Sequence, residues 1–72
     1  MNHNQRQKLL FARSLAPFLG RIVHTPSISP RWNKMRLVEI YSNGNVACLP
    51  LNATDYHGEL KEYHAFSIKE AQ

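Results

Sequence analysis

The chain has 72 residues, of which 43% are hydrophobic and 10% aromatic. This length leaves room for a single domain over residues 1–72, and it limits a core without disulfides or metal to a stability of about 3–5 kcal/mol. The apolar content argues against general disorder. Cys48 is the only cysteine, which excludes an intramolecular disulfide and indicates a reducing compartment.

The net charge of +4 is unevenly distributed along the chain. Residues 1–38 contain seven basic residues and no acid, a net +7, whereas residues 39–72 contain five acids and two lysines, a net −3. Charges separated in this way create a field that can steer a basic face onto an acidic partner. Solvated charge distributed by chance is the alternative interpretation.

The first predicted element is an amphipathic helix over about residues 4–16, a segment rich in good helix formers. Pro17 should end or kink this helix near Leu15, because proline lacks a backbone N–H and restricts the residue before it. We expect the apolar stripe of the helix to cover a sheet. Its members are Phe11, Leu15, Phe18, Leu19 and Ile22.

Residues 24–34 contain two prolines and two serines without a sustained period, which predicts a loop. Ile22 and Val23 could form a short strand before it. Trp32 should be partly ordered, since a tryptophan is costly to leave fully exposed in so small a protein.

A hairpin over about residues 35–50 is the clearest local signal. The β-rich runs MRLVEIYS and NVACLPL are separated by Asn43-Gly44, a pair typical of the two-residue type I′ turn. That turn predicts that Ile40 pairs with Ala47 and Val38 with Leu49, and that these four side chains face the core. The opposite face would then hold Tyr41, Val46 and Cys48.

Residues 59–70 are compatible with helix or strand. Their alternation and aromatic content favour a third antiparallel strand over about residues 61–69. The predicted fold class is therefore α+β, with an N-terminal amphipathic helix packed on a small antiparallel sheet.

No catalytic, metal or cofactor site is predicted. The histidines are scattered, Cys48 lies among apolar residues, and no glycine-rich phosphate loop occurs. We therefore expect no enzyme activity. Arg13 interrupts the N-terminal apolar run too early for a secretory signal, and no stretch is long enough to span a bilayer, so we expect a cytoplasmic protein with no membrane contact.

A partner-binding surface is the remaining candidate site. Tryptophan and arginine are frequent interface anchors, and the basic residues could meet either an acidic protein surface or nucleic acid. Whether Trp32 belongs to the core or to the interface stays open. The candidate residues are Arg6, Lys8, Arg13, Arg21, Arg31, Trp32, Lys34 and Arg36.

Three segments in order, the basic helix QRQKLLFARSLAPFLG, the loop PSISPRW and the hairpin LVEIYSNGNVACL, give the whole chain a resemblance to small proteins with which lytic bacteriophages bind the host RNA polymerase. The resemblance implies an inhibitor of initiation and antitermination factor that binds the N-terminal part of the polymerase β′ subunit in the host bacterial cytoplasm. We expect a monomer when free. A small basic nucleic-acid-binding protein, or a toxin or antitoxin component, is the alternative.

Overall fold

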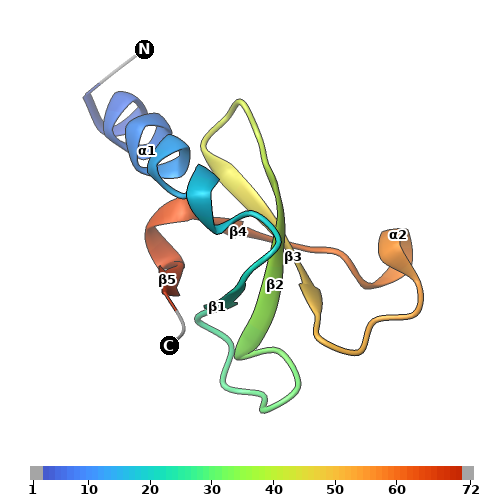
Figure 1. Ribbon diagram of the computed structural model, residues 1–72. Coiled ribbons are helices and arrows are strands. Elements are labelled where there is room, and N and C mark those ends of the chain that lie inside the picture. The colour runs from blue at the N-terminus through green and yellow to red at the C-terminus, as the bar shows by residue number, and fades with distance from the viewer. Residues whose placement is uncertain (1–2, 71–72) are drawn as a thin grey trace.

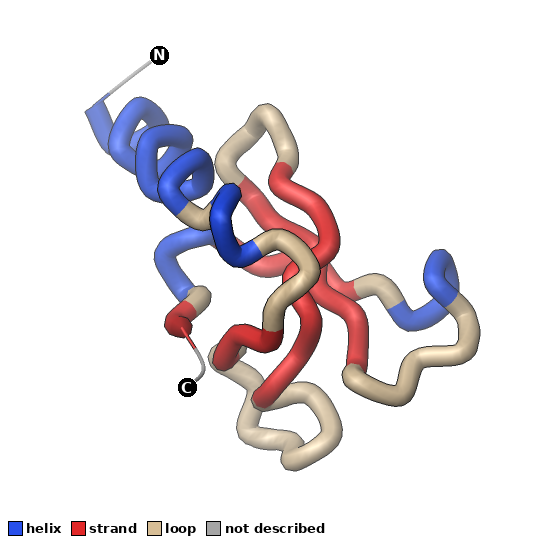
Figure 2. The backbone as a smooth tube through the Cα atoms, viewed as in Figure 1, coloured by secondary structure: helices blue, strands red, loops and turns tan. Residues whose placement is uncertain are grey.

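The computed structural model of the chain describes residues 3–70 (Figure 1). An N-terminal helix precedes an antiparallel sheet (Figure 2), and the predicted α+β fold is thereby confirmed. The strand order in the sheet is β4-β3-β2-β1-β5. The elements are α1 (His3–Ser14), the 3₁₀ turn η1 (Ala16–Phe18), β1 (Ile22–His24), β2 (Lys34–Ile40), β3 (Asn45–Pro50), α2 (Tyr56–Glu59), β4 (Lys61–His64), the 3₁₀ turn η2 (Ala65–Ser67) and β5 (Lys69–Glu70).

Helix α1 ends at Ser14, close to the end that Pro17 predicted. Only the C-terminal part of the helix enters the core, through Ala12 and, just after it, Leu15. Phe11 stays at the surface and packs on Phe66 of η2, with ring centroids 5.2 Å apart. The N-terminal part of α1 therefore presents most of its side chains to solvent.

The hairpin turn is one residue longer than predicted. Gly44 has a φ of +86°, but Asn43 does not have a positive φ, so the type I′ turn is wrong. The Gly44 N–H donates to the Tyr41 carbonyl, and the Tyr41 N–H donates to the Asn45 carbonyl. This is the three-residue loop in which glycine takes the left-handed position. Asn43 instead accepts the Asn45 N–H with its side-chain oxygen, 2.9 Å away.

The longer turn changes the strand register. Ile40 pairs with Val46 and not with Ala47, and Val38 is an extra residue in β2 at a bulge between Leu37 and Glu39. Because side chains alternate across a strand, these shifts correct the predicted faces. The core face holds Met35, Leu37, Val46 and Cys48, whereas the prediction named Val38, Ile40, Ala47 and Leu49; of these, Ile40 does pack against the core.

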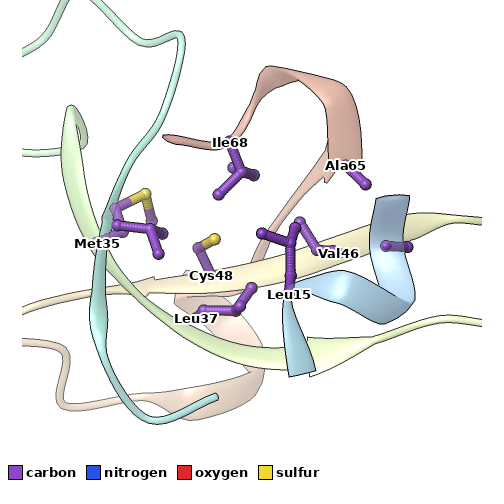
Figure 3. Close-up of a cluster of buried hydrophobic side chains, with 9 residues drawn as sticks. Leu15, Met35, Leu37, Val46, Cys48, Ala65 and Ile68 are labelled. Atoms are coloured by element: carbon purple, nitrogen blue, oxygen red, sulfur yellow. The ribbon is translucent and has the colours of Figure 1, made fainter. Parts of the chain in front are cut away.

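The C-terminal segment is a strand only at its ends. The strand predicted over 61–69 is correct through His64, after which the chain forms η2 and crosses to the opposite edge of the sheet, where β5 pairs with β1. The Ala65 N–H donates to the Gly44 carbonyl, so this crossing begins at the hairpin turn. The crossing places Ala65 and Ile68 over the core (Figure 3).

One hydrophobic cluster thus lies between a face of the sheet and the segments α1, η1 and η2 that cover it. Cys48 belongs to this cluster, and burial raises the pKa of its thiol to about 12. The thiol is therefore neutral at pH 7 and acts as a small hydrophobic group, as its apolar neighbours predicted.

Gly44→Ala should destabilise the protein more than Gly20→Ala. Both glycines have a left-handed φ, where a side chain costs about 1–2 kcal/mol. At Gly44 alone the new Cβ would also lie 2.8 Å from Cγ of Lys8, whereas nothing lies within 4 Å at Gly20. Urea unfolding measures both losses, and Lys8→Ala combined with Gly44→Ala should recover part of the difference. Equal losses of unfolding free energy in Gly44→Ala and Gly20→Ala would show that Lys8 does not restrict a side chain at position 44.

Candidate partner-binding surface

The eight predicted residues fall into three groups. Helix α1 and the loop of residues 25–33 lie at opposite ends of the sheet (Figure 1), so the structure separates the helix residues from Arg31 and Trp32. The helix group is Arg6, Lys8 and Arg13, the loop group is Arg31 and Trp32, and the sheet group is Arg21, Lys34 and Arg36.

The helix group borders a groove. Arg6 and Arg13 line a hollow together with Leu9 and Leu10, all four residues lying on one face of α1 at spacings of three and four. Leu9 and Arg13 also line the adjoining hollow between α1 and the hairpin. Leu10 is 52% exposed. The helix thus has a second face, apolar at its centre and basic at both ends.

The hairpin forms the other wall of this groove. Ile40, Tyr41 and Ser42 line it opposite Leu9, Ala12 and Arg13. The side chain of Lys8 lies on the buried turn glycine, Gly44, so this lysine helps to hold the two walls together.

The sheet group lies at β1 and β2. Arg36 and Lys34 alternate with the buried Met35, which places both on the outer face, the side of the sheet away from the core. There Arg36 is paired with Ile22 and Lys34 with His24 across the strands. Arg36 also donates to the Gly20 carbonyl at 2.6 Å. Arg21 is exposed just before β1.

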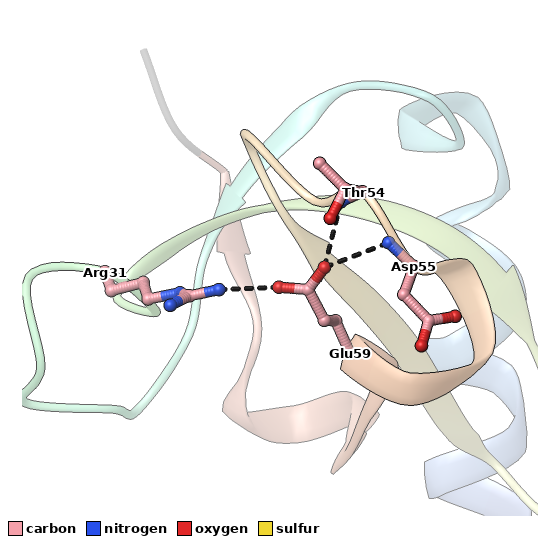
Figure 4. A network of polar contacts seen from close by, with 4 residues as sticks. All are labelled: Arg31, Thr54, Asp55 and Glu59. Atoms are coloured by element: carbon pink, nitrogen blue, oxygen red, sulfur yellow. Dashed lines mark hydrogen bonds and ion pairs between the residues drawn. The ribbon is translucent and has the colours of Figure 1, made fainter.

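The loop group is engaged within the molecule. Arg31 forms an ion pair with Glu59, whose other carboxylate oxygen accepts the N–H groups of Thr54 and Asp55 at 2.9 and 3.0 Å (Figure 4). The Asp55 and Thr54 N–H groups, followed by Arg31, lower the pKa of Glu59. Arg31 therefore fastens the 25–33 loop to Glu59, the last residue of α2.

Trp32 is half-buried and packs against the hydrophobic cluster. The Lys61 ammonium lies 4.1 Å from the centre of its ring, a cation–π distance. The Thr25 hydroxyl donates to the Trp32 carbonyl and fixes the loop on the other side. These contacts place Trp32 at the margin of the core, with part of the residue still exposed.

Sequence reasoning missed the apolar part of the surface. The predicted apolar stripe of the helix leaves out Leu9 and Leu10, although their spacing with Arg6 and Arg13 is visible in the sequence. It also missed Glu39, beside Tyr41 and Tyr56. Partial desolvation, followed by the hydrogen bond to Glu39, raises the pKa of Tyr41. Partial desolvation, followed by the Glu39 charge, raises the pKa of Tyr56.

Residues 3–70 contain no cluster of three or more His, Cys, Asp or Glu side chains placed to hold a metal ion. They also contain no helix with the length and apolar character to cross a membrane. Comparison with protein-family models, curated proteins and solved structures gave no match to this chain.

The pKa of Glu59 should lie below its ordinary value and should rise only part of the way in Arg31→Ala, since the two backbone N–H groups remain. A carboxyl group whose pKa is lowered by folding stabilises the protein above its unfolded pKa, and this contribution is lost as pH falls through the lowered value. NMR titration of the Glu59 carboxyl carbon measures the shift. A return to the ordinary pKa in Arg31→Ala would show that Arg31 alone is responsible.

Proposed function

We propose that this chain is a phage-encoded regulator that binds the host bacterial RNA polymerase through protein–protein contacts, inhibits initiation and promotes antitermination. The resemblance supplies the identity of the partner, in particular the N-terminal part of the β′ subunit. The observation that carries a binding role is the exposed face of α1. There Arg6 and Arg13 flank two leucines, and neither arginine forms an ion pair within residues 3–69.

The composition of this face favours a protein partner. Leucine side chains between two arginines offer apolar contact in addition to charge, and a protein surface can use both. Sequence-independent nucleic-acid binding depends mainly on cations that neutralise phosphates and on aromatic rings that stack on bases. Trp32, the ring best suited to stacking, is packed against the core and approached by Lys61.

Nucleic-acid binding is the second candidate function. Lys34 and Arg36 lie side by side with His24 on the outer face of the sheet, where the register brings β1 and β2 together. Such a group could neutralise phosphates. The same face also carries Glu39 and Glu62, which would repel a phosphate backbone and restrict it to the β1 side.

The proposed action requires no chemistry by this chain. A small protein bound at the RNA exit region occupies polymerase surface, and this would disturb promoter engagement and hinder the changes in the exit channel that accompany termination. The contribution of α1 is to orient the encounter through its charges and to hold the complex through apolar contact.

Arg13→Glu should abolish most of the effect on transcription, whereas Lys69→Glu should leave it intact. Both residues are exposed, but only Arg13 borders the groove on α1. The measurement is transcription with purified bacterial polymerases from several hosts, scored for promoter-dependent initiation and for read-through at a terminator. Equal activity of the two variants would place the contact elsewhere on the molecule.

The nucleic-acid alternative makes a different prediction. In that case the protein binds duplex or single-stranded DNA without polymerase, with an affinity that falls steeply as salt is raised. Lys34→Glu would then weaken DNA binding more than Arg13→Glu. Purified polymerase would bind neither the unmodified protein nor these variants. That pattern would replace the polymerase hypothesis.

A further inference from the structure

The helix–hairpin groove consists of the hollow between α1 and the β2–β3 hairpin and the adjoining hollow on α1 that Arg6, Leu9, Leu10 and Arg13 line. Its floor and its rim differ in character. Leu9 and Ile40 supply apolar surface above the buried Ala12, and Tyr41 and Ser42 stand on the hairpin side. Arg13 lies on the helix side, and Arg6 continues the rim along the helix past Leu10. An apolar floor with basic groups along one rim matches a ligand that carries apolar and acidic groups together.

Arg6 and Arg13, the charged residues of this rim, form no ion pair among residues 3–69. Among residues 3–69 the ion pair of the structure is Arg31–Glu59, at the other end of the sheet from α1. No acidic residue occurs in residues 1–38, so the helix carries no carboxylate of its own to neutralise Arg6 or Arg13. The rim therefore complements an acidic ligand.

The two walls are held in place before any ligand binds. The Lys8 side chain rests on the buried Gly44, and the Gly44 carbonyl accepts the Ala65 N–H from η2. Leu15 is buried in the core just after the helix. A groove whose walls are already fixed loses little conformational entropy on binding, which favours recognition by this surface.

The length of the groove sets the size of the ligand. A third hollow, between Leu9 and Asn43, extends it along the helix to Gln5. The helix from Gln5 to Arg13 advances by eight steps of about 1.5 Å, which is about 12 Å. An extended chain advances about 3.3 Å per residue, so this distance fits about four residues. The groove suits a short segment and is too small for a folded domain.

We propose that the helix–hairpin groove binds a short acidic segment of the partner protein, with one large apolar side chain on Leu9 and Leu10 and flanking carboxylates on Arg6 and Arg13. This inference rests on the proposed function, because it assumes that the partner is a protein. It goes beyond that function by specifying the chemistry of the recognised segment and the place where it binds.

Leu10→Asn and Ile28→Asn form the matched pair that tests the groove. Both leucine and isoleucine are exposed, and Ile28, at 99%, lies in the loop at the far end of the sheet. Leu10→Asn should weaken binding to purified core RNA polymerase about tenfold, since it removes an apolar contact of moderate size. Ile28→Asn should bind like the unmodified protein. Retained protection of the buried Cys48 thiol against alkylation shows that each variant is folded.

Arg6→Glu and Arg13→Glu test the rim, with Lys34→Glu as the control on the outer face. Each rim variant should lose at least tenfold in affinity for the polymerase, mostly through slower association at low salt. The control should lose less than threefold. The affinity of the same variants for duplex DNA distinguishes protein binding from phosphate binding, because Leu10→Asn should not weaken an interaction made with phosphates.

The outcomes distinguish the groove from the function. If the unmodified protein binds polymerase and the groove variants bind equally well, or if Ile28→Asn or Lys34→Glu causes the larger loss, the groove assignment is wrong while the function stands. If the unmodified protein binds no polymerase, the proposed function fails and the groove assignment fails with it. A loss of DNA binding in the arginine variants alone would make the rim a phosphate contact and would overturn the proposal.

Discussion

The structure depends on a one-residue offset in the β2–β3 hairpin. Leu37 and Ile40 are three residues apart, so strict alternation would place them on opposite faces of the sheet. The bulge at Val38 absorbs one residue, and both side chains then reach the core with Val46 and Cys48. A slip of one residue would turn Val46 and Cys48 away from the core and leave the cluster without its centre. In a chain of this size no second cluster could compensate.

The hairpin turn links this register to the rest of the fold. Gly44 receives the side chain of Lys8 from α1 and the N–H of Ala65 from η2, so the helix, the turn and the C-terminal crossing meet at one residue. The left-handed φ of Gly44 defines where the hairpin ends and therefore which residues pair. The position of α1, and the groove beside it, follows from the same contact.

The separation of charge along the chain acquires a physical meaning in the fold. Three of the acids serve as acceptors inside the structure: Glu59 binds Arg31 and the N–H groups before α2, Glu62 accepts from the Asn45 side chain, and Glu39 lies beside two tyrosines. The helix arginines have no such partner among residues 3–69. The acidic half thus stabilises the scaffold, and the basic helix is left to face outward.

Local sequence signals predicted most of the helices and strands, whereas the strand register and the break after His64 depend on contacts with other parts of the chain. The end of α1 followed from Pro17, and the hairpin followed from Asn43-Gly44, because proline and glycine restrict the backbone at their own positions. The register did not follow, since the Asn43 side chain accepts a nearby N–H and this competes with the two-residue turn. The break after His64 was equally hidden, because it arises from a contact of Ala65 with the distant Gly44.

The candidate surface shows the same division. Its basic residues were visible as a charge run, but a run in sequence does not state which charges are neutralised in space. Arg31 meets a glutamate 28 residues away, and Trp32 meets Lys61, so two of the strongest sequence candidates are engaged within the fold. Their contacts are long-range, and no local pattern encodes them.

The leucines of α1 discriminate between classes of partner better than the arginines of the same helix. An exposed ion pair contributes about 0–1 kcal/mol and is screened within about 8 Å at physiological salt, so Arg6 and Arg13 can guide an encounter but cannot hold a complex by themselves. Burial of apolar surface contributes about 25 cal/mol per Å² and is not screened by salt. A groove about 12 Å long can supply only part of a standard interface of about 800 Å² per partner, so it fixes the register of a contact that must extend beyond it. The arginines of the rim therefore govern mainly the association rate, and the leucines of the floor govern mainly the dissociation rate. A partner that supplied only phosphates would make no apolar contact with the leucines.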